Sequence, residues 1–184
     1  MKQGFLIFLS AVMLLSFYGC RSSETQATTT VATTETTIPA PTRPETTQLE
    51  FFLEGMSEYQ DATLFVGEGY SLYITDDAWD VTQGEQGQVT WTSSYNPDIT
   101  LTVIPNAGST FAQAQDSLFA GYLDVEAEGQ YVYGHTEDYR YFQAARFIET
   151  QDGIVAAVWR YTLEAAEGWG ARLRVIAATV EIKE

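Results

Sequence analysis

Residues 141–163 constrain the fold more than any other stretch of this sequence. Two apolar runs flank Asp152 and Gly153, a pair that favours the two-residue turn of a β-hairpin. With these two residues at the turn, Arg146 lies opposite Trp159, so that the guanidinium or its stem rests against the indole ring. Both faces of the hairpin are then largely apolar. We therefore expect these strands at the middle of a sheet that is covered on both sides.

Other strands are predicted by shorter patterns. Residues 70–75 alternate between apolar and polar side chains, the period of a half-buried strand. Aromatic, aliphatic or β-branched runs predict further strands at residues 49–53, 62–66, 89–94 and 99–104. Residues 76–80 are interpreted as an acidic loop.

Two helices are predicted. Thr110 followed by Gln113 fits a capping box, so a helix begins there and ends near Gly121 or in the acidic stretch 124–128. Apolar spacing predicts a second helix over residues 164–178, weakened around Gly168 and followed by a short strand. The fold class is therefore α+β: a central antiparallel sheet of about five to seven strands with two main helices packed on it.

The first twenty residues predict an export signal. Residues 4–19 are uncharged and follow Lys2; as a helix they would span about 24 Å, short of the roughly 30 Å of a hydrocarbon core. Gly19 and Cys20 resemble the end of a bacterial lipobox, where the thiol is lipidated and the leader removed. Phe17 and Tyr18 stand where such motifs usually carry Leu and a small residue.

A lipidated Cys20 places the protein on the outer face of the cell membrane, held there by its lipid. An uncleaved membrane anchor and a free secreted form are the alternatives. Residues 1–20 are thus expected to be the signal peptide ending in the lipobox cysteine. Residues 21–48 follow as a Thr-rich spacer with too little apolar surface to fold, and residues 49–184 form one globular domain.

The charge of the chain is strongly negative. Residues 49–184 contain 22 carboxylates and six basic side chains, which accounts for the net charge of −16. Such a field repels nucleic acid and anionic lipid. It either keeps the domain soluble or forms a surface for a basic protein or another envelope partner.

Few side chains in residues 49–184 suit catalysis. There is one histidine, His135, one lysine, Lys183, and no cysteine, which excludes cysteine nucleophiles and multi-histidine metal sites within this range. We expect no cofactor. Asp76, Asp77 and Asp80 supply the oxygen ligands that calcium prefers, but they lack the alternating spacing of a calcium loop, and an acidic turn is the alternative.

Aromatic side chains form the one candidate binding patch. Tyrosines that alternate along strands either pair across a sheet or, when exposed, stack on sugar rings or hold an extended peptide. The candidate residues are Tyr131, Tyr133, Tyr139, Tyr141, Trp159 and Tyr161.

Two segments resemble known families. Residues 69–74 followed by Trp79 are similar to the opening strand of small exported domains with a PsbP-like fold. Residues 164–173 are similar to the closing helix of uncharacterised Gram-positive lipoproteins that carry comparable spacers. The resemblance implies a PsbP-like sandwich, an antiparallel sheet with helices outside it, and it implies no catalytic residues.

The expected function is that of a monomeric, membrane-anchored surface lipoprotein. Its acidic domain binds or scaffolds an envelope partner or ligand without catalysis. The alternative is a carboxylate-dependent hydrolase acting on cell-wall glycans. That alternative requires a concave pocket with two facing acids about 5–10 Å apart.

Overall fold

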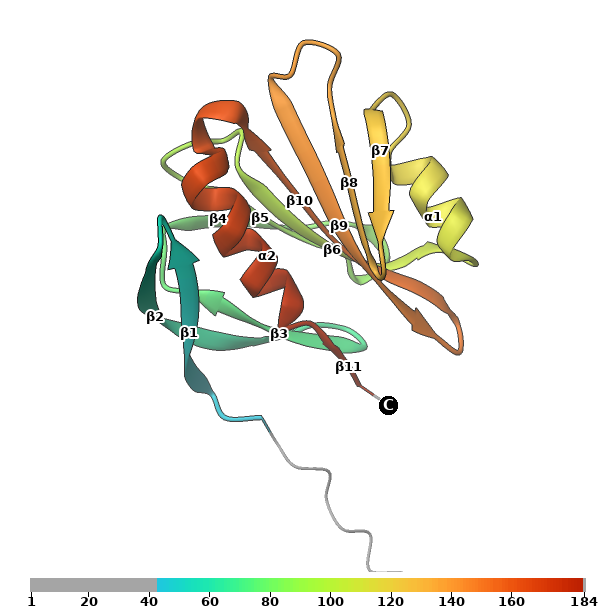
Figure 1. Ribbon diagram of the computed structural model, residues 1–184. Coiled ribbons are helices and arrows are strands. Elements are labelled where there is room, and N and C mark those ends of the chain that lie inside the picture. Colours follow the sequence, from blue (N-terminus) through green and yellow to red (C-terminus); the bar gives the residue numbers. More distant parts are fainter. Residues whose placement is uncertain (1–42, 184) are drawn as a thin grey trace, which may run out of the picture. The chain divides into compact units, whose positions relative to one another are not determined.

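This computed structural model describes residues 43–183, and their strands form two antiparallel sheets (Figure 1). The smaller sheet has the order β1-β2-β3-β11, with β1 (Thr46–Leu53), β2 (Met56–Val66), β3 (Tyr70–Thr75) and β11 (Glu181–Ile182). The larger sheet has the order β4-β5-β6-β10-β9-β8-β7. Its strands are β4 (Trp79–Gln83), β5 (Val89–Ser93), β6 (Thr100–Gly108), β7 (Leu123–Glu128), β8 (Tyr131–His135), β9 (Tyr141–Thr150) and β10 (Gly153–Thr162).

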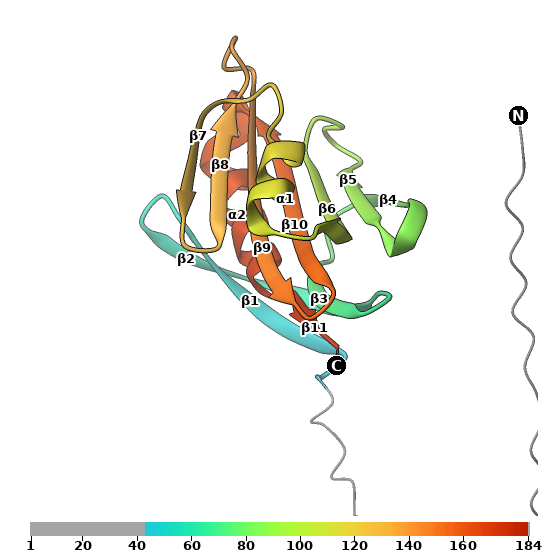
Figure 2. The same ribbon diagram turned by 90° about the vertical axis from the view of Figure 1, so that its right-hand side faces the viewer.

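The two α-helices lie on opposite faces of the seven-stranded sheet (Figure 2). α1 (Phe111–Leu118) covers one face, while α2 (Ala171–Ala178) packs between the other face and the four-stranded sheet. A 3₁₀ turn (Leu163–Ala165) and a π-helical turn (Ala166–Gly170) lead into α2, and a further 3₁₀ turn (Glu85–Gly87) precedes β5. Within residues 43–183 no helix is long and apolar enough to cross a bilayer.

The core is divided by the seven-stranded sheet. On the α2 side, Leu173 and Ile176 pack with side chains of both sheets, among them the fully buried Phe51 and Trp159. On the α1 side, Ala114 packs among buried residues of β8, β9 and β10. Because burying one such large apolar side chain contributes about 1.5–3 kcal/mol, both faces of the sheet help to stabilise the fold.

The predicted fold class was wrong. Residues 43–183 form two sheets of four and seven strands with two eight-residue α-helices, not one central sheet under two main helices. β4 and β7 were missed because their acidic residues indicated a loop at 76–80 and a possible helix end at 124–128, yet both are outer strands that face water for most of their length. Charged side chains on an edge strand prevent pairing with other chains, so acidity and strand structure are compatible there.

The β9–β10 hairpin lies in the middle of its sheet as predicted, but its register differs. Arg146 pairs with Ala157, and Trp159 with Ala144, because the turn residues are Gln151 and Asp152. A shift of two residues leaves every side chain on its original face. The prediction of a hairpin covered on both sides is therefore confirmed, whereas the prediction that Arg146 lies opposite Trp159 was wrong.

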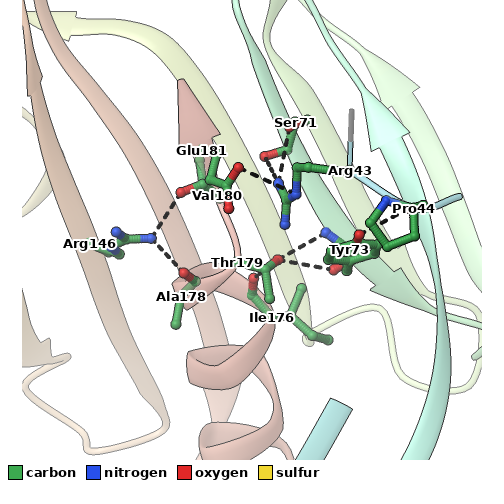
Figure 3. A network of polar contacts seen from close by, with 10 residues as sticks. All are labelled: Arg43, Pro44, Ser71, Tyr73, Arg146, Ile176, Ala178, Thr179, Val180 and Glu181. Atoms are coloured by element: carbon green, nitrogen blue, oxygen red, sulfur yellow. Dashed lines mark hydrogen bonds and ion pairs between the residues drawn. The ribbon is translucent and has the colours of Figure 1, made fainter. Parts of the chain in front are cut away.

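Arg146 instead holds the end of α2 (Figure 3). Its Nη1 donates to the carbonyl oxygens of Ala177 at 3.1 Å, Ala178 at 2.8 Å and Val180 at 3.1 Å. The Ala177 carbonyl also accepts a hydrogen bond from the Val180 N–H at 3.3 Å. Carbonyls at the end of a helix lack the amide partners that a further turn would supply, and the helix dipole makes this end negative. One β9 side chain thereby joins the large sheet to the segment that enters β11.

Arg43 fastens the start of the described chain to the small sheet (Figure 3). Its Nη1 donates to Ser71 Oγ at 3.0 Å, its Nε lies 3.4 Å from Glu181 Oε2, and its guanidinium carbon lies 4.4 Å from the centre of the Tyr73 ring. The folded structure therefore begins before the expected boundary at residue 49.

The predicted start of α1 is confirmed. Thr110 Oγ1 accepts a hydrogen bond from the Gln113 backbone N–H at 3.3 Å, and Gln113 Oε1 accepts one from Ser109 N–H at 3.2 Å. The weakening predicted around Gly168 is also found, as a late start of the last α-helix. The chain near Gly168 and Gly170 forms a π-helical turn before α2.

Candidate functional site

Strand β8 presents alternate side chains to the α2 side of the sheet. Tyr131, Tyr133 and His135 face this side, while Val132 is fully buried on the α1 side. Gly134 also belongs to the α1 side, where a Cβ atom would lie 3.2 Å from side-chain atoms of Phe119. The alternation of a strand thus aligns two phenol rings and one imidazole in a single row.

Arg174 of α2 lies over the two tyrosines of this row. The Tyr131 and Tyr133 rings are stacked, with centroids 6.5 Å apart and planes at 20°. The guanidinium carbon of Arg174 lies 4.9 Å from the centre of the first ring and 6.0 Å from the second. Such contacts between a cation and a ring are favourable. We call Tyr131, Tyr133 and Arg174 the Tyr–Arg face.

No carboxylate of residues 43–183 lies within ion-pair distance of Arg174, although its side chain is exposed. Arg43, Arg140 and Arg172, by contrast, all pair with acidic residues. In a domain with this excess of acids, a guanidinium held only by ring faces leaves its hydrogen-bond donors for a ligand.

Carboxylates flank the Tyr–Arg face. In the β7–β8 pair Glu126 lies opposite Tyr133 and Glu128 opposite Tyr131, and residues directly opposite one another share a face of the sheet. Both glutamates are exposed on the outermost strand. Two ring faces are thus flanked by acceptors on β7 and by a donor on α2.

Further aromatic residues lie on the same side of the sheet. Trp159, 1% exposed, contacts the Tyr131 ring edge-to-face at 6.4 Å. Tyr161 stacks on Phe142 at 5.8 Å and 10°. Burial raises the pKa of both Tyr133 and Tyr161, and the buried Tyr133 Oη has no hydrogen-bond partner among the described residues.

His135, at the end of the row, has both ring nitrogens engaged. Nε2 lies 3.0 Å from Asp124 Oδ2, and Nδ1 lies 2.9 Å from the Thr136 carbonyl oxygen. The Tyr139 ring stacks on the imidazole with centroids 4.1 Å apart. The Thr136 carbonyl and then the Asp124 carboxylate raise the pKa of His135. With both nitrogens facing oxygen acceptors, this imidazole has no free lone pair for general base catalysis.

The predicted aromatic patch is only partly assembled. Tyr131, Tyr133, Trp159 and Tyr161 gather on the α2 side of the sheet. Tyr141 lies on the opposite face, where its hydroxyl donates to Asp98 Oδ1 at 3.1 Å. Tyr139 is 53% exposed in the loop between β8 and β9.

Asp76, Asp77 and Asp80, the weak calcium candidates, are placed differently from one another. Asp76 Oδ1 accepts a hydrogen bond from Thr63 and Asp77 Oδ2 accepts one from Thr75, whereas Asp80 belongs to β4. Within residues 43–183 no group of three acidic, histidine or cysteine side chains is arranged to hold a metal ion. Cys20, the predicted lipidation site, lies outside the described residues.

Sequence reasoning missed the partners of the two tyrosines. Arg174 falls in the second half of the helix predicted over residues 164–178, but α2 starts at Ala171, so Arg174 lies in its first turn. Glu126 and Glu128 were interpreted only as part of the acidic stretch 124–128, where the first helix could end. Their alternation opposite the β8 tyrosines was the available signal, and it becomes visible only once β7 is recognised as a strand.

A separate shallow pocket of about 410 Å³ lies between the β1–β2 turn and the π-helical turn. Its lining includes Glu54, Glu58 and Glu167. Both carboxylate oxygens of Glu58 accept hydrogen bonds from Arg172 Nη2 at 2.8 Å. This pairing engages both oxygens of Glu58 with one guanidinium nitrogen.

Known proteins are similar to parts of this chain. A family described as "Domain of unknown function (DUF8580)" matches residues 43–106, a range that ends before β8 and α2. No curated protein matches the sequence. The fold is similar to the solution structure of cyanobacterial PsbP (CyanoP) from Synechocystis sp. PCC 6803, with a TM-score of 0.46 and 9% identity. That similarity covers 62% of this chain and 87% of the other.

Proposed function

We propose that this protein is a non-catalytic binding protein of the outer face of the cell membrane, attached through lipid on Cys20. Its Tyr–Arg face binds a neutral saccharide chain of the cell envelope. The leader and Gly19-Cys20 support the location. The observation that carries the binding role is the exposed Arg174 guanidinium, which lies over two stacked tyrosines and pairs with no described carboxylate.

The chemistry of the face suits a sugar. The flat apolar ring of tyrosine matches the C–H face of a pyranose. Arg174 supplies donors, and Glu126 and Glu128 supply acceptors, for hydroxyl groups at the edge of such a ring. Because the net charge is −16, a polyanionic polymer is repelled, which favours a neutral glycan.

Co-sedimentation of the full-length, detergent-solubilised protein with purified envelope glycan tests this role. We expect Tyr131→Ala and Arg174→Met to reduce binding by about 5-fold or more, because each removes about 1 kcal/mol or more of contact free energy. Tyr95→Ala, an exposed tyrosine between β5 and β6, and Arg140→Met are matched controls that should bind normally. Equal loss in all four variants, or binding to a basic protein but not to glycan, would overturn the proposal.

Lipid attachment is tested separately. Labelled palmitate should be incorporated into the wild type but not into Cys20→Ala, and the variant should leave the membrane fraction because two acyl chains are needed for stable anchoring. A Cys20→Ala protein that remains equally membrane-bound contradicts the anchor.

Hydrolysis of wall glycans is the second candidate function, and the pocket lined by Glu54, Glu58 and Glu167 favours it. A hydrolase of this kind needs one protonated acid and one carboxylate. Release of reducing ends from glycan by the wild type, and its loss in Glu54→Gln or Glu167→Gln, would support hydrolysis. Full glycan binding with no released ends would reject it.

A further inference from the structure

Two strained backbone positions meet at one side chain. Asp124 and Tyr139 have positive φ values of 47° and 55°, which are uncommon for residues other than glycine. The Asp124 carboxylate contacts the His135 imidazole, and the Tyr139 ring stacks on it. Strained residues persist only where surrounding contacts hold them, and they gather at functional sites. Asp124 and Tyr139 are both held by contact with the same imidazole, that of His135.

The Asp124 position also breaks the pairing of β7 with β8. The register shifts between Leu123 and Glu126, so the strand is irregular next to His135. Irregularities of this kind bend an edge strand and aim its side chains. Glu126, which flanks Tyr133 on the Tyr–Arg face, follows immediately after this irregularity. The position of Glu126 therefore depends on how Asp124 is held.

The protonated ring satisfies both contacts of His135. A neutral imidazole carries one N–H and one lone pair, so one of its nitrogens would point a lone pair at either the Thr136 carbonyl or the Asp124 carboxylate. The imidazolium donates to both. Loss of its proton therefore removes one hydrogen bond and leaves an oxygen facing a nitrogen lone pair.

The change of charge near neutral pH belongs to His135 and not to its neighbours. Asp124 of β7 and Tyr139 of the loop are the ionisable groups that contact the imidazole, and Phe142 of β9 contributes only an apolar ring at 6.0 Å. The nearby Asp138 carboxylate accepts hydrogen bonds from Thr136 Oγ1 at 2.6 Å and Arg140 N–H at 3.1 Å. These hydrogen bonds lower the pKa of Asp138, so it stays ionised where the imidazole changes charge.

We propose that His135 is a pH-sensitive switch for the Tyr–Arg face. Its imidazolium holds the irregular part of β7 and the Tyr139 loop in place, and the neutral imidazole releases both. This inference rests on the saccharide-binding role proposed for that face. The fixed arrangement, with Glu126 beside Tyr133, binds the saccharide, and the released arrangement binds it more weakly. Acid conditions at the cell surface thus favour binding.

The direction of the pH effect follows from the contacts. Both contacts raise the pKa of His135 above its ordinary value of 6.5. The stabilisation of the folded state by the charged His135 ring is fully present below pH 6.5, where the ring is charged in folded and unfolded chains alike. It is lost as the pH rises through the pKa of the folded state.

The test uses the fact that this chain has a single histidine. The ring signals of His135 can therefore be assigned without ambiguity in NMR spectra of the full-length protein in detergent. We expect His135 to titrate above pH 6.5, and the signals of Tyr139, Glu126 and Tyr133 to shift with the same midpoint. Asp124→Asn should lower that midpoint. If His135 titrates while the NMR signals of Glu126 and Tyr133 do not shift, the switch is overturned and the proposed binding role is unaffected.

A binding series completes the experiment. Neutral envelope glycan should bind the wild type about 5-fold more weakly above the His135 midpoint than below it, a typical coupling between two sites. His135→Gln should bind with no pH dependence over this range. Wild-type binding that does not change with pH overturns the switch. Absence of binding at a pH where NMR shows the imidazolium overturns the saccharide role itself and the switch with it.

Discussion

Replacing Arg146 by methionine should lower the stability of the domain and loosen the end of α2. Methionine keeps much of the stem volume but removes the guanidinium, whose Nη1 is shared among three carbonyl oxygens. The contacts with Ala178 and Val180 are drawn in Figure 3. Two of these carbonyls belong to the buried residues Ala177 and Val180. They would lose their charged donor in a region that water reaches poorly.

The magnitude follows from the donor count. Nη1 carries two hydrogens, so its three contacts amount to about two full hydrogen bonds. Hydrogen bonds to a charged group contribute about 1.5 kcal/mol or more each, so Arg146→Met should cost about 3 kcal/mol. For a domain of this size that loss lowers the melting temperature by about 10 °C. The fourth contact, from Nε to the exposed Gln130 side chain at 3.1 Å, adds little.

Chemical denaturation of the full-length protein measures the effect, with Arg140→Met as the matched control. The Arg140 side chain is 62% exposed and lies 3.8 Å from Asp98, so its loss should cost less than about 1 kcal/mol. Hydrogen exchange should also become faster at the Lys183 amide, which donates to Gly69 O in the short β11 region. A difference of less than about 1 kcal/mol between the two variants, with a Lys183 amide that remains protected, would show that the Arg146 contacts do not hold the end of α2.

Three further predictions concern local structure. Gly67→Ala should lower the free energy of unfolding by about 1–3 kcal/mol in denaturation experiments, because a Cβ atom would lie 2.5 Å from the Tyr70 ring. Unchanged stability would contradict this packing. Gly168→Ala, where a Cβ atom meets nothing within 4 Å, should instead raise the melting temperature, because alanine is favoured over glycine in a helical turn by about 0.5–1 kcal/mol. Burial raises the pKa of Tyr70 to about 12. The wild type should therefore lose more stability than Tyr70→Phe between pH 10 and 12. Parallel curves of unfolding free energy against pH for the two proteins would contradict that burial.

Local rules predicted the features that depend on a few neighbouring residues. The start of α1 follows from Thr110 and Gln113 within a single turn, and the late start of α2 follows from Gly168 and Gly170. The apolar nature of both faces of β9 and β10 also survived an error in register, because a shift of two residues preserves the faces.

The edge strands and the binding face depend on distant parts of the chain. β7 carries Asp124, Glu126 and Glu128, and its strand structure follows only from pairing with β8. Arg174 reaches Tyr131 and Tyr133 because the chain passes through β9, β10 and the turns before α2. The contact of His135 with Asp124 needs the irregularity in β7, which no residue pattern indicated.

NMR mapping of the full-length protein with a neutral envelope saccharide locates the binding site. At a pH where His135 is charged, the largest shifts should belong to Tyr131, Tyr133 and the Arg174 guanidinium, with Glu126 and Glu128 next. Shifts concentrated around Glu54 and Glu167, or no shifts at saturating saccharide, would rule out binding at the Tyr–Arg face.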